Sequence, residues 1–379
     1  MDFSSASTTE LIISGLFVIS WFIQLWFLLV RIRPLAFHSL PAIQTEATNT
    51  KPVSVIICAK NESENLEKFL PKVLTQEYPE FEVIVVNDCS EDDSEMVLAR
   101  LKEKYPHLYY TNIPVDRKFS HGKKLALTIG VKAAKNNHLV LTDADCYPTS
   151  EKWLSGMMQG FKEGKEIVLG VGTYEKQSGF ANLLTRYDTF VTAIQYLGYA
   201  LSKKPYMGVG RNLAYKKELF VKNNGVKSHS HILSGDDDLF VQSVANKHNT
   251  EIIINPEAQT ISTPPGNLSG WRRQKARHLT TAPYYKGSIK RALFSDLITR
   301  QILIAFTILL IIFNTFAIIA AGLFLFMFVI RLLFNRNISI KLAQGRLHWW
   351  MLIFEFIHPW YLLWAQLANL FSRKKSKWK

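Results

Sequence analysis

The chain has 379 residues, of which 48% are hydrophobic and only 20% are charged, so it is too apolar for an intrinsically disordered protein. The net charge is +14, and residues 331–379 alone carry nine basic side chains against one acidic one. Because this excess lies among apolar segments, we expect it to face anionic membrane lipid, and we expect no nucleic-acid partner.

The first predicted element is a transmembrane helix over residues 11–30, since twenty positions without a charge can cross about 30 Å of hydrocarbon. A cleaved signal peptide is the alternative, but no basic residue precedes this run, and the run is longer than the usual signal core of about 7–15 residues. Arg31 and Arg33 follow it, and the positive-inside rule then places the following chain in the cytoplasm. Residues 1–50 are predicted to be an anchor and a linker.

Residues 51–292 have the composition of a soluble domain, which we expect on the cytoplasmic side. Its three cysteines lack metal-ligand spacing and are typical of a reducing compartment. Short β-branched or aromatic runs alternate with helical patterns, which predicts an α/β fold with a largely parallel sheet. The predicted strands are residues 53–58, 81–86, 108–113 and 138–142, and the predicted helices are residues 64–76, 90–105 and 122–136.

Polar side chains follow three of these strands. Lys60 and Glu62 come after the first strand, Asp88 after the second, and Asp143 and Asp145 after the fourth. A single acid at a strand end is usually a turn or a helix cap, but carboxylates gathered at one edge of a sheet repel one another and favour a bound metal or cationic ligand. An Asp-x-Asp pair can offer oxygen ligands to Mg²⁺ or Mn²⁺, with diphosphate oxygens completing the shell.

Together with the segments GVGRNLAYKKELF (208–220), SGDDDLF (234–240) and QKARH (274–278), these strand ends resemble the family 2 glycosyltransferases over residues 51–280. The resemblance implies a GT-A fold, that is, a Rossmann-like nucleotide-diphospho-sugar transferase domain, here flanked by transmembrane helices. It also implies contacts to the donor and its divalent cation. The residues at the matching positions are Lys60 and Glu62 at the nucleoside, Asp88 at a uracil ring, Lys123 or Lys124 on the donor side, and Asp143 and Asp145 at the metal, with Asp145 the closer ligand.

The resemblance also assigns the acceptor side. The Glu-Asp-x-Asp motif of the family aligns with residues 235–238, which makes Asp236 the candidate general base, and Asp237 is a second candidate because Gly235 replaces the glutamate. An acidic first helical turn is the structural alternative for this cluster. A base is needed because the acceptor hydroxyl must lose its proton as it attacks the anomeric carbon, and direct displacement inverts the configuration there.

The last motif of the resemblance is Gln-x-x-Arg, with Gln274 and Arg277 on one helix face. It implies contacts to the diphosphate and the acceptor, where a fixed guanidinium would stabilise the charge of the leaving group. His278 stands where the family has tryptophan. The alternative interpretation is a basic amphipathic helix that lies on the bilayer.

Residues 293–379 are predicted to be a C-terminal membrane region with a basic tail. The uncharged run of residues 302–330 is long for one span and short for two, and we favour a helical hairpin over residues 297–334. Residues 348–371 are apolar and aromatic but contain Glu355, His358 and Pro359. They either span the membrane or lie along its interface.

We therefore expect an integral membrane glycosyltransferase with its catalytic domain in the cytoplasm. The expected donor is a nucleotide sugar with UDP as its nucleotide, and the expected cofactor is Mg²⁺ or Mn²⁺. The expected acceptor is a lipid or a lipid-linked cell-envelope saccharide at the membrane. A processive polysaccharide synthase is the first alternative. Nucleotidyl transfer and a membrane-tethered nucleotide-sugar-binding protein without catalysis are the others.

Overall fold

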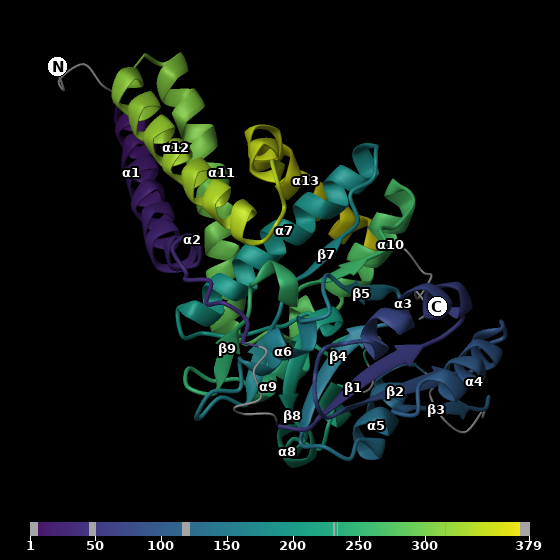
Figure 1. The fold of residues 1–379 in the computed structure, drawn as a ribbon. Helices are drawn as coiled ribbons and strands as arrows, with labels where there is room; N and C mark the ends of the chain where they lie inside the picture. The colour runs from purple at the N-terminus through teal and green to yellow at the C-terminus, as the bar shows by residue number, and fades with distance from the viewer. Residues whose placement is uncertain are drawn as a thin grey trace.

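The computed structural model describes residues 7–44, 51–115, 122–229, 232, 234–314 and 316–371. The predicted basic tail lies outside the described residues. Figure 1 shows an α/β domain from which a bundle of long helices projects.

The main sheet contains seven strands in the order β3-β2-β1-β4-β8-β6-β9. Strand β8 runs antiparallel to β4 and β6, and the other neighbours are parallel. These strands are β1 (Val53–Ala59), β2 (Phe81–Asp88), β3 (Leu108–Ile113), β4 (His138–Asp143), β6 (Ile167–Leu169), β8 (Leu213–Lys216) and β9 (Thr250–Ile252). A smaller sheet has the order β5-β10-β7 and contains β5 (Cys146–Pro148), β10 (Thr260–Ser262) and β7 (Gly172–Tyr174). The four strands predicted from the sequence are thereby confirmed.

Helices cover both faces of the main sheet, as expected for a central parallel strand such as β1, in which every residue is buried. Successive residues of β1 point to opposite faces, so Val55 enters the core beneath α3, α4 and α6, whereas Ile56 enters the core beneath α5 and α7. The helices of this domain are α3 (Ser63–Leu74), α4 (Ser94–Lys104), α5 (Lys123–Ala133), α6 (Trp153–Met158), α7 (Phe180–Leu201), α8 (Lys217–Lys222), α9 (Asp238–Val244) and α10 (Leu268–Leu279). The helices predicted between the first four strands are α3, α4 and α5.

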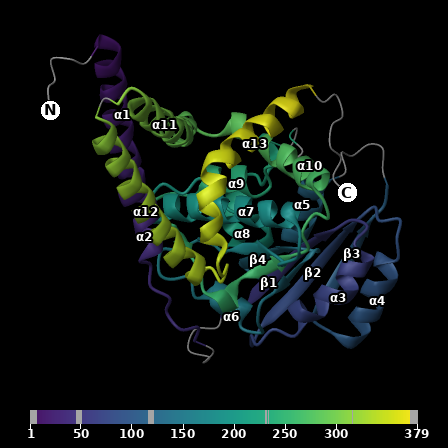
Figure 2. The ribbon, with the colours of Figure 1, turned by 90° about the horizontal axis from the view of Figure 1, so that it is seen from above.

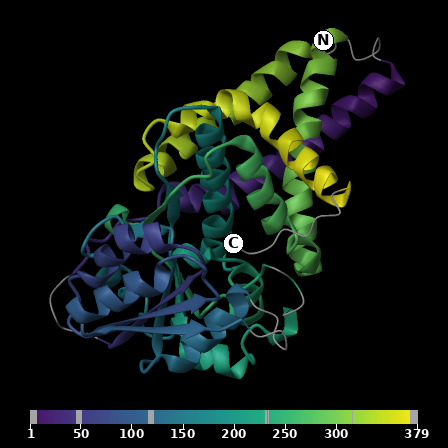
Figure 3. The same ribbon diagram turned by 90° about the vertical axis from the view of Figure 1, so that its right-hand side faces the viewer.

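Three helical segments among the described residues are long and apolar enough to cross a membrane: Thr8–Ala36, α11 (Gly287–Ile312) and α12 (Ala317–Lys341). The first consists of α1 (Thr8–Phe27), a π-helical turn and α2 (Arg33–Ala36). Helices α1, α11 and α12 lie side by side in Figures 1 and 3 and pack against one another. Helix α11 begins before the predicted domain boundary at residue 293, so this boundary falls inside a helix.

The fourth long helix, α13 (Met351–Phe371), is not among these candidate spans. It lies across the α/β domain (Figure 2) and packs against α10. The ring of Tyr361 makes an edge contact with Trp271 of α10, with 6.1 Å between the ring centroids. Helix α13 therefore belongs to the contact surface between the domain and the bundle.

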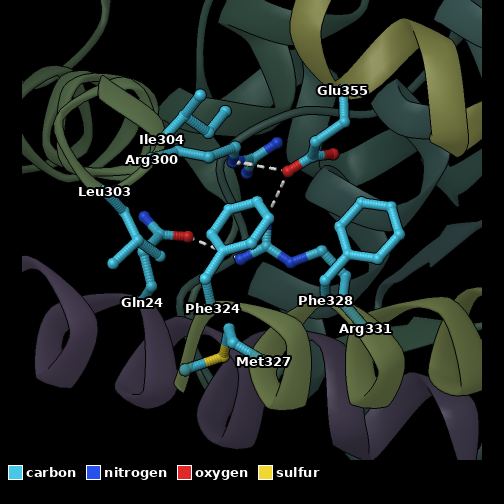
Figure 4. A pocket seen from close by; sticks show the side chains of 9 residues that line it. All are labelled: Gln24, Arg300, Leu303, Ile304, Phe324, Met327, Phe328, Arg331 and Glu355. Carbon is cyan, nitrogen blue, oxygen red and sulfur yellow. Dashed lines mark hydrogen bonds and ion pairs between the residues drawn. The ribbon is translucent and has the colours of Figure 1, made fainter. Parts of the chain in front are cut away.

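Five polar side chains, three of them buried and two half-buried, connect the four long helices, and Figure 4 shows four of them together. Arg331 of α12 donates to Glu355 of α13 at 2.7 Å and to Gln24 of α1 at 2.5 Å. Arg300 of α11 donates to Asp296 at 2.9 Å and lies 3.5 Å from the same Glu355 oxygen. We call Gln24, Asp296, Arg300, Arg331 and Glu355 the helix charge cluster. Each cation in it is paired with a carboxylate, which is the condition for a buried ion pair to be tolerated.

The α/β domain also contacts the first candidate span directly. A Cβ atom on Gly198 of α7 would lie 2.4 Å from the Arg31 carbonyl oxygen, so only glycine allows this approach. The Arg31 guanidinium lies over the Tyr199 ring, 4.1 Å from its centroid, and Ser202 donates to the Val30 carbonyl at 2.7 Å. The domain is thus held against the bundle at two places, through α7 and through α13.

Candidate active site

The polar strand ends meet at one edge of the main sheet. The register of β1 and β4 places Cys58 beside Asp143. Burial raises the pKa of the Cys58 thiol, and the nearby carboxylates of Asp236, Asp143 and Asp88 raise it further. Residues from three distant parts of the sequence are therefore brought together around the end of β1.

Lys123, the first residue of α5, joins two groups of acids. Its ammonium nitrogen lies 2.8 Å from Asp143 Oδ1 and 3.0 Å from Asp236 Oδ2. Burial disfavours the charged form, but Asp143, Asp236 and Asp237 outweigh it and raise the pKa of Lys123 well above its ordinary value. Lys123 is therefore a fixed cation between the Asp-x-Asp pair and the acidic triplet of residues 236–238.

The Asp-x-Asp pair fits a hard divalent cation. One ligand atom each of Asp143, Asp145 and Cys146 lies within 4.8 Å of the others. Burial and the neighbouring Asp143 carboxylate raise the pKa of Asp145, as happens when two carboxylates share a site without a cation. The Cys146 sulfur lies 2.9 Å from Ser262 Oγ, and burial raises the pKa of this thiol, so it stays protonated. The two carboxylates are thus the ligands suited to Mg²⁺ or Mn²⁺.

The acidic triplet divides into residues with different surroundings. Asp237 is the N-cap of α9, and its two oxygens accept hydrogen bonds from the backbone N–H groups of Asp238 and Gly210, each at 2.8 Å. Asp238 accepts from the Thr281 hydroxyl at 2.5 Å and from the Tyr285 hydroxyl at 2.7 Å. Asp237 thereby holds the loop at Gly210, and Asp238 holds the segment that contains Thr281 and Tyr285.

Asp236 is the member of the triplet that faces Asp143 through Lys123. Burial alone would raise its pKa, but the Lys123 ammonium outweighs burial and holds the pKa of Asp236 below its ordinary value. Burial and the charges of Asp236 and Asp238 raise the pKa of Asp237 to about 7. We call the residues Asp88, Asp143, Asp145, Asp236, Asp237 and Asp238 the acidic edge.

Gln274 of α10 is connected to the acidic edge through Tyr174 of β7. Its side-chain amide donates to the Tyr174 hydroxyl at 2.6 Å. The Arg211 guanidinium lies over the ring of Tyr174, 4.5 Å from the centroid, and attracts the Asp145 carboxylate. Arg277 follows Gln274 by one turn on the same helix and is half-buried.

A buried ion pair fixes α10 in this position. Lys275 donates to both oxygens of Asp188 on α7, at 2.7 and 2.9 Å. His358 of α13 lies 2.9 Å from Asp188 Oδ1. Although burial opposes ionisation, Lys275 and His358 hold the pKa of Asp188 well below its ordinary value. Helices α7, α10 and α13 are thereby connected at one point.

The residues predicted at the nucleoside lie at the ends of β1 and β2. Asp88 is fully buried at the end of β2. Asn61 has a left-handed backbone (φ 53°), and its N–H donates to Ser90 at 2.8 Å, which fixes the turn that carries Lys60 and Glu62. Glu62 accepts from the Asn65 amide at 2.5 Å. This turn thus lies beside the acidic edge and connects the first two strand ends.

Residues 54–222 match the model of the family described as Glycosyl transferase family 2. This part of the chain is a family 2 glycosyltransferase domain. The match runs from β1 into α8, so it includes the Asp-x-Asp pair and Lys123, whereas the acidic triplet and α10 lie after it.

The family 2 domain has similar sequences in bacteria and archaea. The chain is 30% identical over 198 residues to Glycosyltransferase AglE of Haloferax volcanii, a match that covers 50% of this chain and 60% of AglE. It is 29% identical over 128 residues to the poly-beta-1,6-N-acetyl-D-glucosamine synthase of Staphylococcus epidermidis, covering 34% of this chain and 29% of that protein. The chain thus spans less than two thirds of either relative.

A solved structure shares the arrangement of the whole chain. The mannosyltransferase PcManGT from Pyrobaculum calidifontis, solved in complex with GDP-Man and Mn²⁺, superposes with a TM-score of 0.60 at 18% identity, over 96% of this chain and 99% of that one. The similarity confirms the predicted fold class: the family 2 domain is a GT-A α/β domain with long apolar helices before and after it.

The structure also adds Tyr174, a site residue that the sequence did not indicate, and gives a place to Arg211, which lies in the segment of residues 208–220 that resembles the family. Tyr174 comes from a three-residue strand with no motif, and nothing in its sequence context points to Gln274 or Arg211. Arg211 lies in the glycine-containing loop of residues 208–212, whose glycines alone are explained by a turn. Its side chain fills the space beside Gly172, where a Cβ atom would lie 2.4 Å from it, so this contact depends on two distant loops.

Proposed function

We propose that the protein is an inverting glycosyltransferase that moves a sugar from a nucleotide diphosphate sugar to a lipid or lipid-linked saccharide at the cytoplasmic face of a membrane. The observation that carries this proposal is the convergence of Asp143, Asp145 and Asp236 around Lys123. One group of acids suits the donor diphosphate and its cation, and the other supplies a base for the acceptor hydroxyl.

Asp236 is the proposed general base. Its carboxylate takes the proton of the acceptor hydroxyl, the hydroxyl oxygen forms a bond to the anomeric carbon, and the bond to the diphosphate oxygen breaks with its electron pair. Geometry supports Asp236 over Asp237 as the base. Both oxygens of Asp237 are occupied by backbone N–H groups, whereas Asp236 faces Asp143 through Lys123. The raised pKa of Asp237 would make it the stronger base, but we assign the role to Asp236 because of this difference in hydrogen bonding.

Asp143 and Asp145 are the proposed ligands of Mg²⁺ or Mn²⁺. When bound, the ion neutralises the charge that develops on the leaving diphosphate. Lys123, Gln274 and Arg277 are proposed to complete the diphosphate side, since a lysine and an arginine bind phosphate oxygens directly. Lys60, Glu62 and Asp88 are proposed to bind the nucleoside. UDP is the donor nucleotide expected from the sequence, and GDP is the alternative suggested by the solved mannosyltransferase.

The membrane setting supports a lipid acceptor. Three candidate spans and the direct contact between α7 and the first of them hold the active site close to the bilayer. Arg31 and Arg33, near the C-terminal end of the first candidate span, support a cytoplasmic site. A site held at the surface raises the effective concentration of a membrane-bound acceptor.

A processive polysaccharide synthase is the second candidate, and the staphylococcal poly-beta-1,6-N-acetyl-D-glucosamine synthase favours it. It differs from the first proposal in its product. A single transferase adds one sugar to each acceptor, whereas a synthase produces a ladder of lengths on gel or in mass spectra.

The experiment that tests the proposal measures release of nucleotide diphosphate by the full-length protein in nanodiscs with added membrane lipid extract. UDP- and GDP-sugars are each supplied with Mn²⁺, with Mg²⁺ or with chelator, beside the Asp145→Asn variant. Release from one donor that needs the metal and is lost in the variant supports the transferase. Calorimetric binding of a nucleotide sugar without any release supports the non-catalytic binding protein, and release that is equal with chelator contradicts the metal assignment.

A further inference from the structure

A groove of about 430 Å³ lies between α10 and α13, within the range of about 300–1,000 Å³ that is usual for ligand sites. Trp271 is buried and forms its base with Tyr361, whereas Trp360 and Trp364 are 62% and 49% exposed. The residues that line the groove are Leu268, Trp271, Ile357, Trp360, Tyr361 and Trp364.

This groove is part of the catalytic domain rather than of the membrane bundle. Its α13 wall is not one of the candidate spans among the described residues. That wall is fixed to the domain by the contact of His358 with Asp188, which also binds Lys275 of α10. The two walls lie next to each other in Figure 2. The exposed aromatic rings are therefore held in a defined place beside the site.

The groove is close to the proposed chemistry and has a basic rim. Trp271 precedes Gln274 by three residues on α10, about 4.5 Å along the helix axis, and Gln274 contacts Tyr174 of the active site. The Arg272 guanidinium lies 5.5 Å from the Trp364 ring centroid, and both Arg272 and Arg273 are exposed. The positively charged Arg272 and Arg273 thus lie next to the apolar groove, and Gln274 on the same helix connects it to the acidic edge.

We propose that this groove binds the hydrocarbon chain of the lipid acceptor, with an anionic head at Arg272 and Arg273. This inference rests on the proposed function, and it names the acceptor as an anionic lipid. The lining favours a hydrocarbon chain over a saccharide, because sugar hydroxyls need hydrogen-bond partners when they leave water, and the six lining residues offer only indole and phenol groups. Apolar and aromatic side chains bind a hydrocarbon chain through the area removed from water.

The test uses a long-chain alkyl phosphate that carries a photoreactive diazirine, with the full-length protein in nanodiscs. After irradiation, mass spectrometry locates the label. The expected result is labelling concentrated on residues 268–272 and 357–364 and displaced by unlabelled alkyl phosphate. Labelling spread evenly over the lipid-facing sides of α11 and α12, or displacement by phosphatidylglycerol at equal concentration, would mean that ordinary bilayer lipid covers the groove and would overturn the proposal.

Variants then test the lining and the rim separately. Because Trp360 and Trp364 are exposed, their replacement by alanine leaves the folded core intact and is expected to weaken alkyl phosphate binding about fivefold or more. Trp349→Ala is the matched control, since Trp349 is 51% exposed outside the groove, and it should bind normally. Arg272→Gln should weaken binding of the alkyl phosphate but not of the corresponding alkanol. Equal loss with both ligands, or normal binding in the tryptophan variants, contradicts the assignment.

Labelling is a binding measurement, so its outcome does not depend on turnover. Nucleotide diphosphate release without groove labelling would overturn this inference and leave the proposed function standing. Groove labelling without release from any donor would contradict the proposed function and retain the lipid site. Weaker binding of a soluble oligosaccharide in the Trp360 and Trp364 variants, with alkyl phosphate binding unchanged, would assign the groove to sugars and overturn the inference.

Discussion

The helix charge cluster and the acidic edge are both largely buried, but their charges are balanced in different ways. In the helix charge cluster, Arg331 and Arg300 share Glu355, and Asp296 completes the second pair. At the acidic edge, six carboxylates gather near Lys123 and Arg211, so the described residues leave an excess of negative charge. The positive and negative charges of the helix charge cluster therefore balance one another. The acidic edge carries excess negative charge and can accept an additional cation.

This difference separates a structural cluster from a functional one. Charged groups buried in a membrane bundle are costly unless paired, so each member of the helix charge cluster is needed by the others. Carboxylates that repel one another cost stability, and a protein retains them where a ligand supplies the missing charge. Removal of one charge from the helix charge cluster should therefore lower the stability of the fold. Removal of one charge from the acidic edge should instead lower the rate of the reaction.

The largest effect is expected for the proposed base. Asp236→Asn should lower turnover by about 10²–10⁴-fold, the usual contribution of a general base, and should leave nucleotide-sugar affinity nearly unchanged. Steady-state release of nucleotide diphosphate and calorimetric binding measure the two quantities. Asp237→Asn is the matched control and should lose less turnover, because Asp237 positions the loop at Gly210. A larger loss in Asp237→Asn would transfer the role of base to that residue.

The helix charge cluster should respond in the opposite way. Arg331→Met leaves Glu355 and Gln24 without their shared donor and should lower the free energy of unfolding by about 3–5 kcal/mol. Thermal denaturation in detergent or nanodiscs measures the change, with the exposed Arg336→Met as control. The double variant Arg331→Met/Glu355→Leu should regain much of the loss. A single variant as stable as the original protein would show that this cluster does not hold the bundle together.

The ion pair of Asp188 gives a smaller test of how α10 is held. Lys275→Met removes two charge-assisted hydrogen bonds and should cost about 1.5–3 kcal/mol, together with faster proteolysis near α10. The matched control is Lys222→Met, since Lys222 belongs to an exposed pair at 4.0 Å that should contribute little. Equal stability of both variants would mean that α10 is positioned by its apolar contacts alone.

The smallest effect is the pH dependence of the cation-free protein. The pKa of Asp237 is raised to about 7 from an unfolded value of about 3.9, so its contribution to stability is full below about pH 4 and is lost as pH rises towards 7. The melting temperature in chelator should fall by roughly 2–8 °C between about pH 5 and pH 7. Asp237→Asn should flatten this profile, and an unchanged profile would contradict the shift.

The strands and helices that position the acidic edge could be predicted from the sequence because their signals are local. The β-branched runs in β1 and β2 and the acids at or just after the ends of these strands are recognised within a few residues. The pairing of Lys123 with both Asp143 and Asp236 could not be predicted, because it depends on how α5 and α9 meet. The place of α13 could not be predicted for the same reason: its composition suits a membrane surface, and only its contacts with Asp188 and Trp271 place it on the domain.

The hydrogen bond between Gln24 and Arg331 joins positions 307 residues apart, and this separation has a consequence for biosynthesis. At about 5–20 residues per second, the ribosome needs roughly 15–60 s after making Gln24 before Arg331 emerges. The first candidate span is therefore complete, with one uncharged amide in that position, while the entire family 2 domain is still being made. The charged partners arrive later on the helices that follow, so the bundle can close only around a catalytic domain that has already been synthesised.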